Sequence, residues 1–402
     1  MIQAMTPSVP LPGDCWPTAA QTWLLRAALL PAEPAQAAWQ VWRSRAGPLE
    51  QLDEGSRRLL PLLYRNLRRS LSPSQMAEPP IPRLRAGYRR TWFRNQAAFY
   101  QMAELLEGLH SAGLPTLILK GAALAVLHYR DLGLRPMADF DIAVPSGRAL
   151  EAFEALRQLG WSPDMPIRRP AEYVAIRQSA DFRSTSGTHF DLHWYLLWDC
   201  CYPGADDDFW SGAVPLRVNQ VQTRALNPTD QLLHVCVHGA LLNRVPPVRW
   251  AADAMQILRT PGAAPDWPRL LAQAQRLRLS LSLRATLHYL RTALDAEIPA
   301  SVVDALAAMP VTELDRAFYR RKISRRGLLG EIPLMWSHYG LLAQARRRPA
   351  TRAGFVRYLR LNWGLDDSRG IPLFVVNKFF RRLKAVSRQP EQDQPDLEPS
   401  AP

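Results

Sequence analysis

The sequence has few cysteines and no long apolar runs, and both shortages limit what the protein can be. Its 402 residues include four cysteines, and none of them forms a CxxC pair. Cys200 and Cys201 are adjacent and could hardly bridge each other without strain. We therefore expect reduced thiols, a cytoplasmic setting and no zinc site. No apolar stretch reaches about 18 residues, so we expect no membrane-spanning helix. The N-terminal residues do not have the pattern of a signal peptide.

A phosphate-binding motif of the GxxxxGK[ST] type is also missing, which argues against a P-loop enzyme. The remaining composition, with 47% hydrophobic and 21% charged residues, is typical of a folded protein. A chain of this length can bury a sizeable core and form two or three structural units. We therefore expect a folded protein whose chemistry does not depend on a Walker motif.

The net charge of +14 has a single location in the sequence. Residues 316–384 contain 17 Lys and Arg and three acidic residues, and the rest of the chain is close to neutral. Residues 371–384 (IPLFVVNKFFRRLK) combine an apolar run with four cations. We interpret the region as a helical subdomain with a solvated Arg-rich face. Contact with an anionic membrane surface is the first alternative, which would place the protein at the periphery of the inner membrane, and nucleic acid is the less favoured one.

The order of apolar periodicities and breaks predicts five segments. They are a helical unit with a connector (1–82), an α/β core (83–225), a helical subdomain that completes a cleft (226–300), a basic helical region (301–388) and a disordered tail (389–402).

Individual elements are also predicted from this pattern. The expected helices cover 83–110, 121–129, 148–159, 230–242, 249–258, 267–277 and 281–294. The expected strands cover 114–120 and 139–144, and 180–194 resembles a hairpin around Thr185-Ser186-Gly187.

Two aspartates, Asp139 and Asp141, give the clearest functional signal. Side chains alternate along a strand, so both carboxylates are expected on one side of the predicted strand. Such a pair suits a divalent cation, and oxygen ligands favour Mg²⁺ or Mn²⁺. A DxD triplet alone is more often a solvated strand edge. Asp191, between Phe190 and Leu192 on another predicted strand, adds the third carboxylate of a two-metal phosphoryl-transfer site.

Nearby residues supply candidates for phosphate binding. Gly121 at a strand-to-helix turn would let backbone amides approach a phosphate, and Lys120 would add a positive charge. Arg135 would bind a triphosphate or neutralise the acids; a surface arginine is an equal alternative. His193 is expected on the same side of its strand as Asp191, where it acts as an acid or base, binds phosphate, or makes a structural hydrogen bond.

Two further groups are weaker candidates. His234 and His238 share a helix face, but Val235 occupies the position of the Glu in the zinc-protease motif HExxH, so we expect packing or supporting roles. Arg249 and Asp253 on the next predicted helix either line a substrate pocket or pack between helices.

The ordered set LKG, Tyr129, Arg135, DFDIAV and FDLHW resembles the polymerase-beta-type nucleotidyltransferase superfamily, and in particular the bacterial "nucleotidyltransferase family protein" group. The resemblance covers about residues 105–258. It implies an α+β fold, in which a small mixed β-sheet core is flanked by helices, with an N-terminal helical unit and a C-terminal helical region. It also implies that Gly121 matches the family glycine, that Asp139 and Asp141 are the metal-binding pair, and that Asp191 is the third acid.

Two features depart from the superfamily pattern. Ala122 stands where familiar members have Ser, and the spacing from the glycine to the DxD pair is longer than in compact members. Lys120 is expected to compensate for the missing hydroxyl. We therefore predict transfer of a nucleoside monophosphate from an NTP to an unknown acceptor, with Mg²⁺ or Mn²⁺ as cofactor. The alternative is an inactive binding or scaffold protein with this fold, associated with a membrane surface in polysaccharide or peptide assembly.

The site expected from the sequence has two parts. The catalytic and metal-binding residues are Asp139, Asp141 and Asp191, and the nucleotide-binding residues are Lys120, Gly121, Arg135 and His193.

Overall fold

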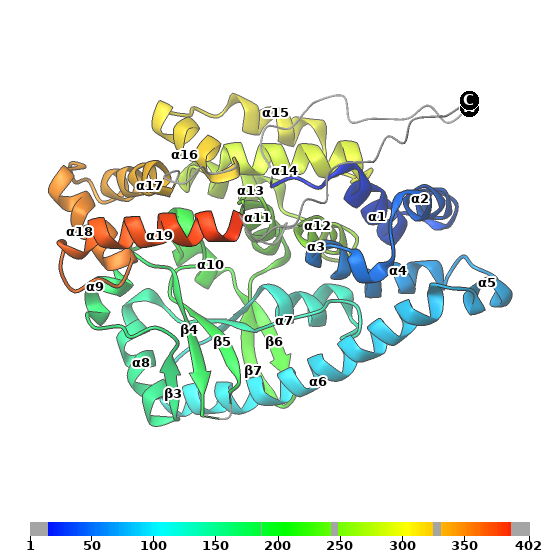
Figure 1. Ribbon diagram of the computed structural model, residues 1–402, viewed down its shortest axis with the longest axis horizontal. Helices are drawn as coiled ribbons and strands as arrows, with labels where there is room; N and C mark the ends of the chain where they lie inside the picture. Colours follow the sequence, from blue (N-terminus) through cyan, green and yellow to red (C-terminus); the bar gives the residue numbers. More distant parts are fainter. Residues whose placement is uncertain (1–14, 186, 243–247, 325–330, 387–402) are drawn as a thin grey trace, which may run out of the picture.

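A seven-stranded sheet, flanked by helices, organises the computed structural model (Figure 1). The model describes residues 15–185, 187–242, 248–324 and 331–386. The predicted disordered tail, 389–402, lies outside the described residues. The strand order is β3-β4-β5-β2-β1-β7-β6. The strands are β1 (Leu117–Leu119), β2 (Asp141–Ala143), β3 (Trp161–Pro163), β4 (Ser179–Ser184), β5 (His189–His193), β6 (Val214–Val218) and β7 (Val221–Ala225).

The sheet is mixed. β2 runs parallel to β5 and β1 runs parallel to β7, whereas the other neighbouring pairs are antiparallel. The central strands β1 and β2 are short and fully buried, because helices cover both of their faces. The predicted α+β fold class with a small mixed sheet is confirmed.

Alternation along the central strands divides the apolar core into two clusters. Ile118 and Ile142 face what we call the sheet cluster, which includes Phe190 and Leu192 and is closed by α6 and α8. Leu117, Leu119 and Ala143 face the helical cluster on the other side of the sheet.

The helix α6 (Ile81–Ser111) is the longest element and runs beneath the sheet in Figure 1. Leu84, Phe99, Leu106 and other apolar residues recur at helical spacing and are buried. The helix ends where Gly113 adopts a φ of 70°, a conformation that glycine tolerates without a steric penalty. α8 (Ala149–Gln158) ends similarly at Gly160, with a φ of 80°. Both predicted helices are confirmed, and each is followed by a glycine with a positive φ.

The helical cluster joins two parts of the chain that are far apart in sequence. The hydroxyl groups of Thr22 and Tyr289 lie 3.0 Å apart, and the Arg26 guanidinium donates to the carbonyl oxygen of Ala293 at 2.7 Å. The N-terminal helices are α1 (Ala19–Leu29), α2 (Ala32–Arg45), α3 (Glu54–Arg57), α4 (Leu60–Leu67) and α5 (Pro73–Ala77). Their partners are α11 (Pro228–Gly239), α12 (Arg249–Leu258), α13 (Trp267–Arg276), α14 (Ser280–Ala293) and α15 (Ala300–Ala308).

The C-terminal helices pack against the core through buried polar contacts. The ammonium of Lys322 is 2.8 Å from Asp199 Oδ1, and His338 lies between the hydroxyl of Tyr358 and the carbonyl oxygen of Trp198. These helices are α16 (Glu313–Ile323), α17 (Glu331–Ala345) and α18 (Arg352–Asn362), and α19 (Gly370–Val386) follows them. Within the part of the chain that the structure describes, no helix is both long and apolar enough to cross a membrane.

Several short elements differ from the expectation. The strand expected at 139–144 is reduced to Asp141–Ala143, so Asp139 lies before it. The reason is that β1 ends at Leu119, opposite Asp141, and offers no further partner on that side. The helix expected at 121–129 begins at Lys120 as α7 (Lys120–Leu124) and continues as a π-helix, η2 (Ala125–Tyr129). The strands β3, β6 and β7 were not anticipated.

The remaining short segments connect these elements. They are the 3₁₀ helices η1 (Leu49–Gln51), η3 (Ser146–Arg148) and η4 (Trp198–Cys200), and the helices α9 (Pro170–Val174) and α10 (Asp207–Ser211).

Candidate active site

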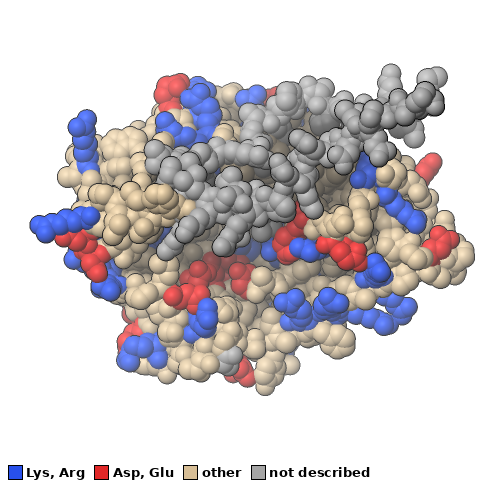
Figure 2. Space-filling model, viewed as in Figure 1, with Lys and Arg blue, Asp and Glu red and all other residues tan. Residues whose placement is uncertain are grey.

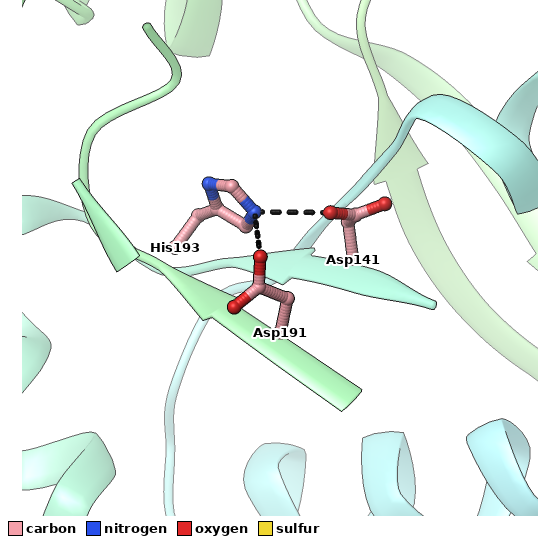
Figure 3. Close-up of side chains that lie close together, drawn as sticks. All are labelled: Asp141, Asp191 and His193. Carbon is pink, nitrogen blue, oxygen red and sulfur yellow. Dashed lines mark hydrogen bonds and ion pairs between the residues drawn. The ribbon is translucent and has the colours of Figure 1, made fainter. Parts of the chain in front are cut away.

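Acidic side chains from neighbouring strands meet on one face of the sheet. The parallel register of β2 and β5 places Asp141 opposite Asp191, and Ala143 opposite His193. Phe140 and Ile142 face the sheet cluster, so Asp141 between them points to the opposite face, towards the helical cluster. The carboxylates and the imidazole therefore come together on this face of the sheet, as Figure 3 shows.

His193 joins the two carboxylates. Its Nε2 lies 3.0 Å from Asp141 Oδ1 and 3.2 Å from Asp191 Oδ2 (Figure 3). The His193 side chain is fully buried, whereas 8% of the Asp141 side chain and 19% of the Asp191 side chain are exposed. One ligand atom from each of the three residues lies within 4.8 Å of the others. Solvent therefore reaches this group at Asp191.

Lys120 supplies the cation closest to these acids. Leu119, the last residue of β1, pairs with Asp141 across β1 and β2. Lys120 is the next residue, and it therefore lies beside Asp141, with its Nζ atom 2.6 Å from Asp141 Oδ1. The backbone of Lys120 has a φ of 42°, a left-handed conformation that a residue with a side chain adopts at an energetic cost. The strain is located at the residue that contacts the central carboxylate.

The electrostatics of this group favour charged forms of all four side chains. Burial alone would raise the pKa of Asp141, but Lys120 and then His193 outweigh it and hold that pKa well below its usual range. Burial also opposes ionisation of Asp191, whose pKa is lowered by the hydrogen bond from His193. The pKa values of Lys120 and His193 are raised, because their carboxylate partners outweigh the effect of burial.

Asp139 approaches the group from the loop before β2. The residue is exposed and precedes β2, which corrects the expectation that it lies on one strand with Asp141. Desolvation of its carboxyl group and the charge of Asp141 raise its pKa, while Lys120 and Arg249 act in the opposite direction. These interactions place Asp139 beside the cluster, although it is not among the three residues whose ligand atoms converge within 4.8 Å.

A fourth acid, Asp181 on β4, was not recognised in the sequence. It pairs in register with Asp191, so Asp181, Asp191 and Asp141 form a row across three adjacent strands. Desolvation and then the neighbouring charge of Asp191 raise the pKa of Asp181 to about 6. Figure 2 shows acidic side chains gathered on this face over β4 and β5. The predicted hairpin at 180–194 could have indicated this residue, because antiparallel pairing of its two strands places Asp181 opposite Asp191.

Gly121 and Ala122 have packing roles. A Cβ atom at Gly121 would lie 2.7 Å from Arg135 Nη1 and 2.9 Å from Met137 Sδ, so a side chain there would displace the loop that leads to β2. Ala122 is fully buried in the sheet cluster, so a serine hydroxyl at this position would be surrounded by apolar groups. An alanine at position 122 therefore suits the apolar core.

Arg135 is buried in an ion pair with a residue of α12. Its Nε atom lies 2.8 Å from Asp253 Oδ1, and its Nη2 atom lies 2.8 Å from Asp253 Oδ2. Asp253 also accepts a hydrogen bond from the Tyr129 hydroxyl at 2.7 Å. Asn95 on α6 donates to the carbonyl oxygen of Arg135 at 2.8 Å. The network fixes the loop between η2 and β2, and 4% of the Arg135 side chain is exposed.

His234 and His238 form a stacked pair on α11, with ring centroids 6.2 Å apart. His234 Nε2 contacts the carbonyl oxygen of Leu196 at 3.1 Å. Burial, and then the positive charge of Lys120, lower the pKa of His234 to about 3. A neutral His234 therefore lies on the helical side of the site, near Lys120 and His193.

Asp141, Asp191 and His193 together fit a divalent cation. Two carboxylates and one imidazole, with ligand atoms within 4.8 Å of one another, are the donor types that bind such ions in proteins. Lys120, which now neutralises Asp141, would be free to pair with another anion if a cation took its place.

Comparisons with known proteins add independent information. A protein-family model described as "Uncharacterised nucleotidyltransferase" matches residues 56–295, which is more than half of the chain. Among curated proteins, none matches this sequence. A crystal structure of an antigenic nucleotidyltransferase-like protein from Paracoccidioides brasiliensis is similar over 52% of this chain and 97% of its own, with 17% sequence identity and a TM-score of 0.35.

Proposed function

Because the chain belongs to the family of uncharacterised nucleotidyltransferases, we propose that it transfers a nucleoside monophosphate from an NTP to an acceptor in a reaction that needs a divalent cation. The observation that supports this proposal best is the meeting of Asp141, Asp191 and His193, from two adjacent parallel strands, with Lys120 at the start of α7. Charged groups with shifted pKa values that gather in a partly buried place are candidates for a functional site.

In this proposal, Asp139, Asp141 and Asp191 hold Mg²⁺ or Mn²⁺. A bound cation would neutralise the triphosphate charge and lower the pKa of the attacking hydroxyl group. Asp141 and Asp191 come from rigid strands, whereas Asp139 joins them from the preceding loop. Asp191 is the more exposed of the two strand carboxylates and is therefore placed to meet the acceptor hydroxyl.

The other residues bind and orient. Lys120 pairs with the triphosphate, in keeping with its position as the cation nearest to the acids. His193 fixes the orientation of both carboxylates through one nitrogen atom. Arg135, held by Asp253, positions the loop that carries Asp139, and Gly121 leaves the space that this loop needs.

Calorimetry with each of the four NTPs, in the presence of Mg²⁺ or Mn²⁺, tests the proposal. The wild-type protein is expected to bind at least one NTP in a cation-dependent manner. The Asp139→Ala/Asp141→Ala variant is expected to lose that binding by at least about 100-fold, the loss expected when two ligands of one cation are removed. The exposed Asp304→Ala serves as a matched control and binds like the wild type. Unchanged binding by a folded double variant would refute the proposal.

A second function, nucleotide binding without turnover, is motivated by Ala122. The serine that familiar superfamily members use at this position is replaced by a buried methyl group. Pyrophosphate release from an NTP distinguishes the two functions, because a scaffold protein would bind the nucleotide without releasing pyrophosphate at any acceptor concentration.

Contact with an anionic membrane surface stays a separate prediction for α19. Two of its apolar residues, Leu373 and Val376, are 65% and 47% exposed. Co-sedimentation with anionic vesicles should therefore decrease in the Leu373→Ser/Val376→Ser variant, and equal sedimentation of variant and wild type would contradict this prediction.

A further inference from the structure

The outer face of α6 carries exposed aromatic rings. Phe93 and Tyr100 are 67% and 64% exposed, and Trp92, which contacts Phe93 edge to face at a centroid distance of 5.2 Å, is 38% exposed. Phe93 and Tyr100 are seven residues apart, so they lie on the same side of the helix, separated by about 10 Å. A group of exposed apolar side chains with polar residues around it is typical of an interaction surface.

Arginines surround these rings. The stretch from Ile81 to Ala103 contains five arginines and no acidic residue, although the part of the chain before residue 316 is close to neutral overall. Arg83 pairs with Glu50. The other four are exposed and form no ion pair with any residue that the structure describes; they are Arg85, Arg89, Arg90 and Arg94. We call these four arginines with Phe93 and Tyr100 the α6 face.

The α6 face has the composition of a nucleic-acid surface and not that of a membrane-binding helix. A helix that inserts into a membrane has a continuous apolar stripe. Here the polar, exposed Gln96 lies between Phe93 and Tyr100 on this side of the helix. Arg89 and Arg90 lie one turn before Phe93. Guanidinium groups attract phosphates, and neighbouring exposed rings stack on bases.

The location of the α6 face also fits a macromolecular partner. Figure 2 shows Lys and Arg side chains in a row along α6, on the same side of the molecule as the acidic group over β4 and β5. On the inner side of the same helix, Asn95 donates hydrogen bonds to the carbonyl oxygens of Leu132 and Arg135, next to the candidate active site. The helix therefore has one side towards the site and one side towards solvent.

We propose that the α6 face binds a single-stranded nucleic acid, with the four arginines on its phosphates and Phe93 and Tyr100 stacked on bases. This binding is independent of the proposed nucleotidyl transfer, since none of the acidic residues takes part in it. Bases and phosphates are common to RNA and DNA, so both must be tested.

Fluorescence anisotropy of the full-length chain with labelled 20-nucleotide oligo(U) and oligo(dT) tests the proposal, without NTP or divalent cation. The Arg85→Gln/Arg89→Gln/Arg90→Gln/Arg94→Gln variant keeps helix-forming residues and is expected to bind at least about 10-fold more weakly. Its slope of log K against log salt concentration should decrease by about 3, because each lost phosphate contact on a single strand contributes about 0.7. Phe93→Ala/Tyr100→Ala is expected to weaken binding by about 10-fold with the slope unchanged.

A control variant removes the same charge elsewhere. Arg284, Arg291, Arg348 and Arg352 are exposed arginines outside α6, and replacing all four by Gln should leave the affinity within about 2-fold, as expected of arginines that contact no phosphate. An equal loss in both quadruple variants, or binding to anionic vesicles that depends on Phe93 and Tyr100 in place of binding to either oligonucleotide, would overturn the proposal. Asp139→Ala/Asp141→Ala should bind the oligonucleotides like the wild type, which separates this proposal from the proposed function.

Discussion

Two charged regions of the protein differ in how their charges are neutralised. In the candidate active site, Lys120, Asp141, His193 and Asp191 contact one another within 3.2 Å and are largely buried. On the α6 face, four arginines are exposed and have no acidic partner among the described residues. The buried charges support one another within the fold, whereas the exposed ones are available to an external anion. Net charge alone would have hidden this difference, because neither region lies in the segment that carries the excess charge.

The comparison predicts that buried, paired charges determine stability and that exposed, unpaired charges determine binding. Five variants test it and are taken in order of decreasing effect on the free energy of unfolding, with Lys120→Gly beside Lys120→Met.

Asp253→Ala is expected to have the largest effect. It leaves the guanidinium of Arg135 buried without its partner, and breaking such a pair destabilises a protein by about 3–5 kcal/mol. Urea denaturation at pH 7 measures the change. Glu154→Ala, which removes an exposed partner of Arg157, serves as the control and should change the midpoint by no measurable amount. Similar midpoints for the two variants would contradict the prediction.

Asp206→Asn tests a buried carboxyl group with few compensating contacts. Oδ2 accepts a hydrogen bond from the Leu196 amide, but Oδ1 has no partner, and burial raises the pKa of Asp206 to about 7. The folded state therefore binds more protons than the unfolded state between about pH 4 and pH 7, so this group makes the wild type less stable as the pH rises.

Because burial raises the pKa of Asp206 from about 4 to about 7, ionisation of this group lowers the free energy of unfolding by up to about 4 kcal/mol. The Asn variant, which stays neutral, should gain this much relative to the wild type between pH 4 and pH 8 in urea denaturation. The exposed neighbour Asp207→Asn is the control. A constant difference between Asp206→Asn and the wild type across this pH interval would exclude the expected ionisation.

Lys120→Met removes the ammonium beside Asp141 and should reduce the free energy of unfolding at pH 7 by about 1–3 kcal/mol. The pKa of Asp141 lies below its ordinary value of 3.8, so its pairing contributes stability above about pH 4 and less as the pH falls further. The difference between variant and wild type should consequently narrow below pH 4.

Lys120→Gly provides the matched variant. It loses the same ammonium but relieves the left-handed backbone conformation, so it should be more stable than Lys120→Met by about 1 kcal/mol. If the two variants were equally stable, the backbone at this position would not be strained.

The quadruple Gln variant of the α6 face is expected to have the smallest effect on stability, within about 0.5 kcal/mol, because its four side chains lie in solvent. The same variant should show the largest loss of oligonucleotide binding. If the quadruple Gln variant were destabilised as strongly as the Asp253→Ala variant, these arginines would have structural partners, which would contradict the prediction.

Much of the candidate site could be predicted from the sequence because local rules govern it. Alternation along strands brings Asp141 and Asp191 to one face, and the order of strand, turn and helix places Lys120 above them. The family resemblance, which the family model confirms, carried the same information. The prediction that Asp139 lies on the same strand as Asp141 was wrong. The first residue of β2 depends on where the neighbouring strand β1 ends, and the alternation of side chains does not predict the length of β1.

Longer-range features escaped prediction for a physical reason. The partner of Arg135 lies 118 residues further along the chain, on a helix whose position depends on the packing of the whole helical cluster. The hairpin of β6 and β7, in contrast, has a readable signal, since apolar residues alternate from Val214 to Ala225 around Asn219, which adopts a φ of 51°. Pro215 within the first strand obscures that signal.

The length of α6 has a consequence for how the protein unfolds. Its 31 residues extend about 46 Å without interruption. Leu84 near one end belongs to the helical cluster, and Phe99 and Leu106 towards the other end belong to the sheet cluster. Neither cluster can lose its packing without releasing part of a helix that the other one needs. We therefore expect the two cores to melt together in one cooperative transition, with α6 as the element that transmits loss of order from one to the other.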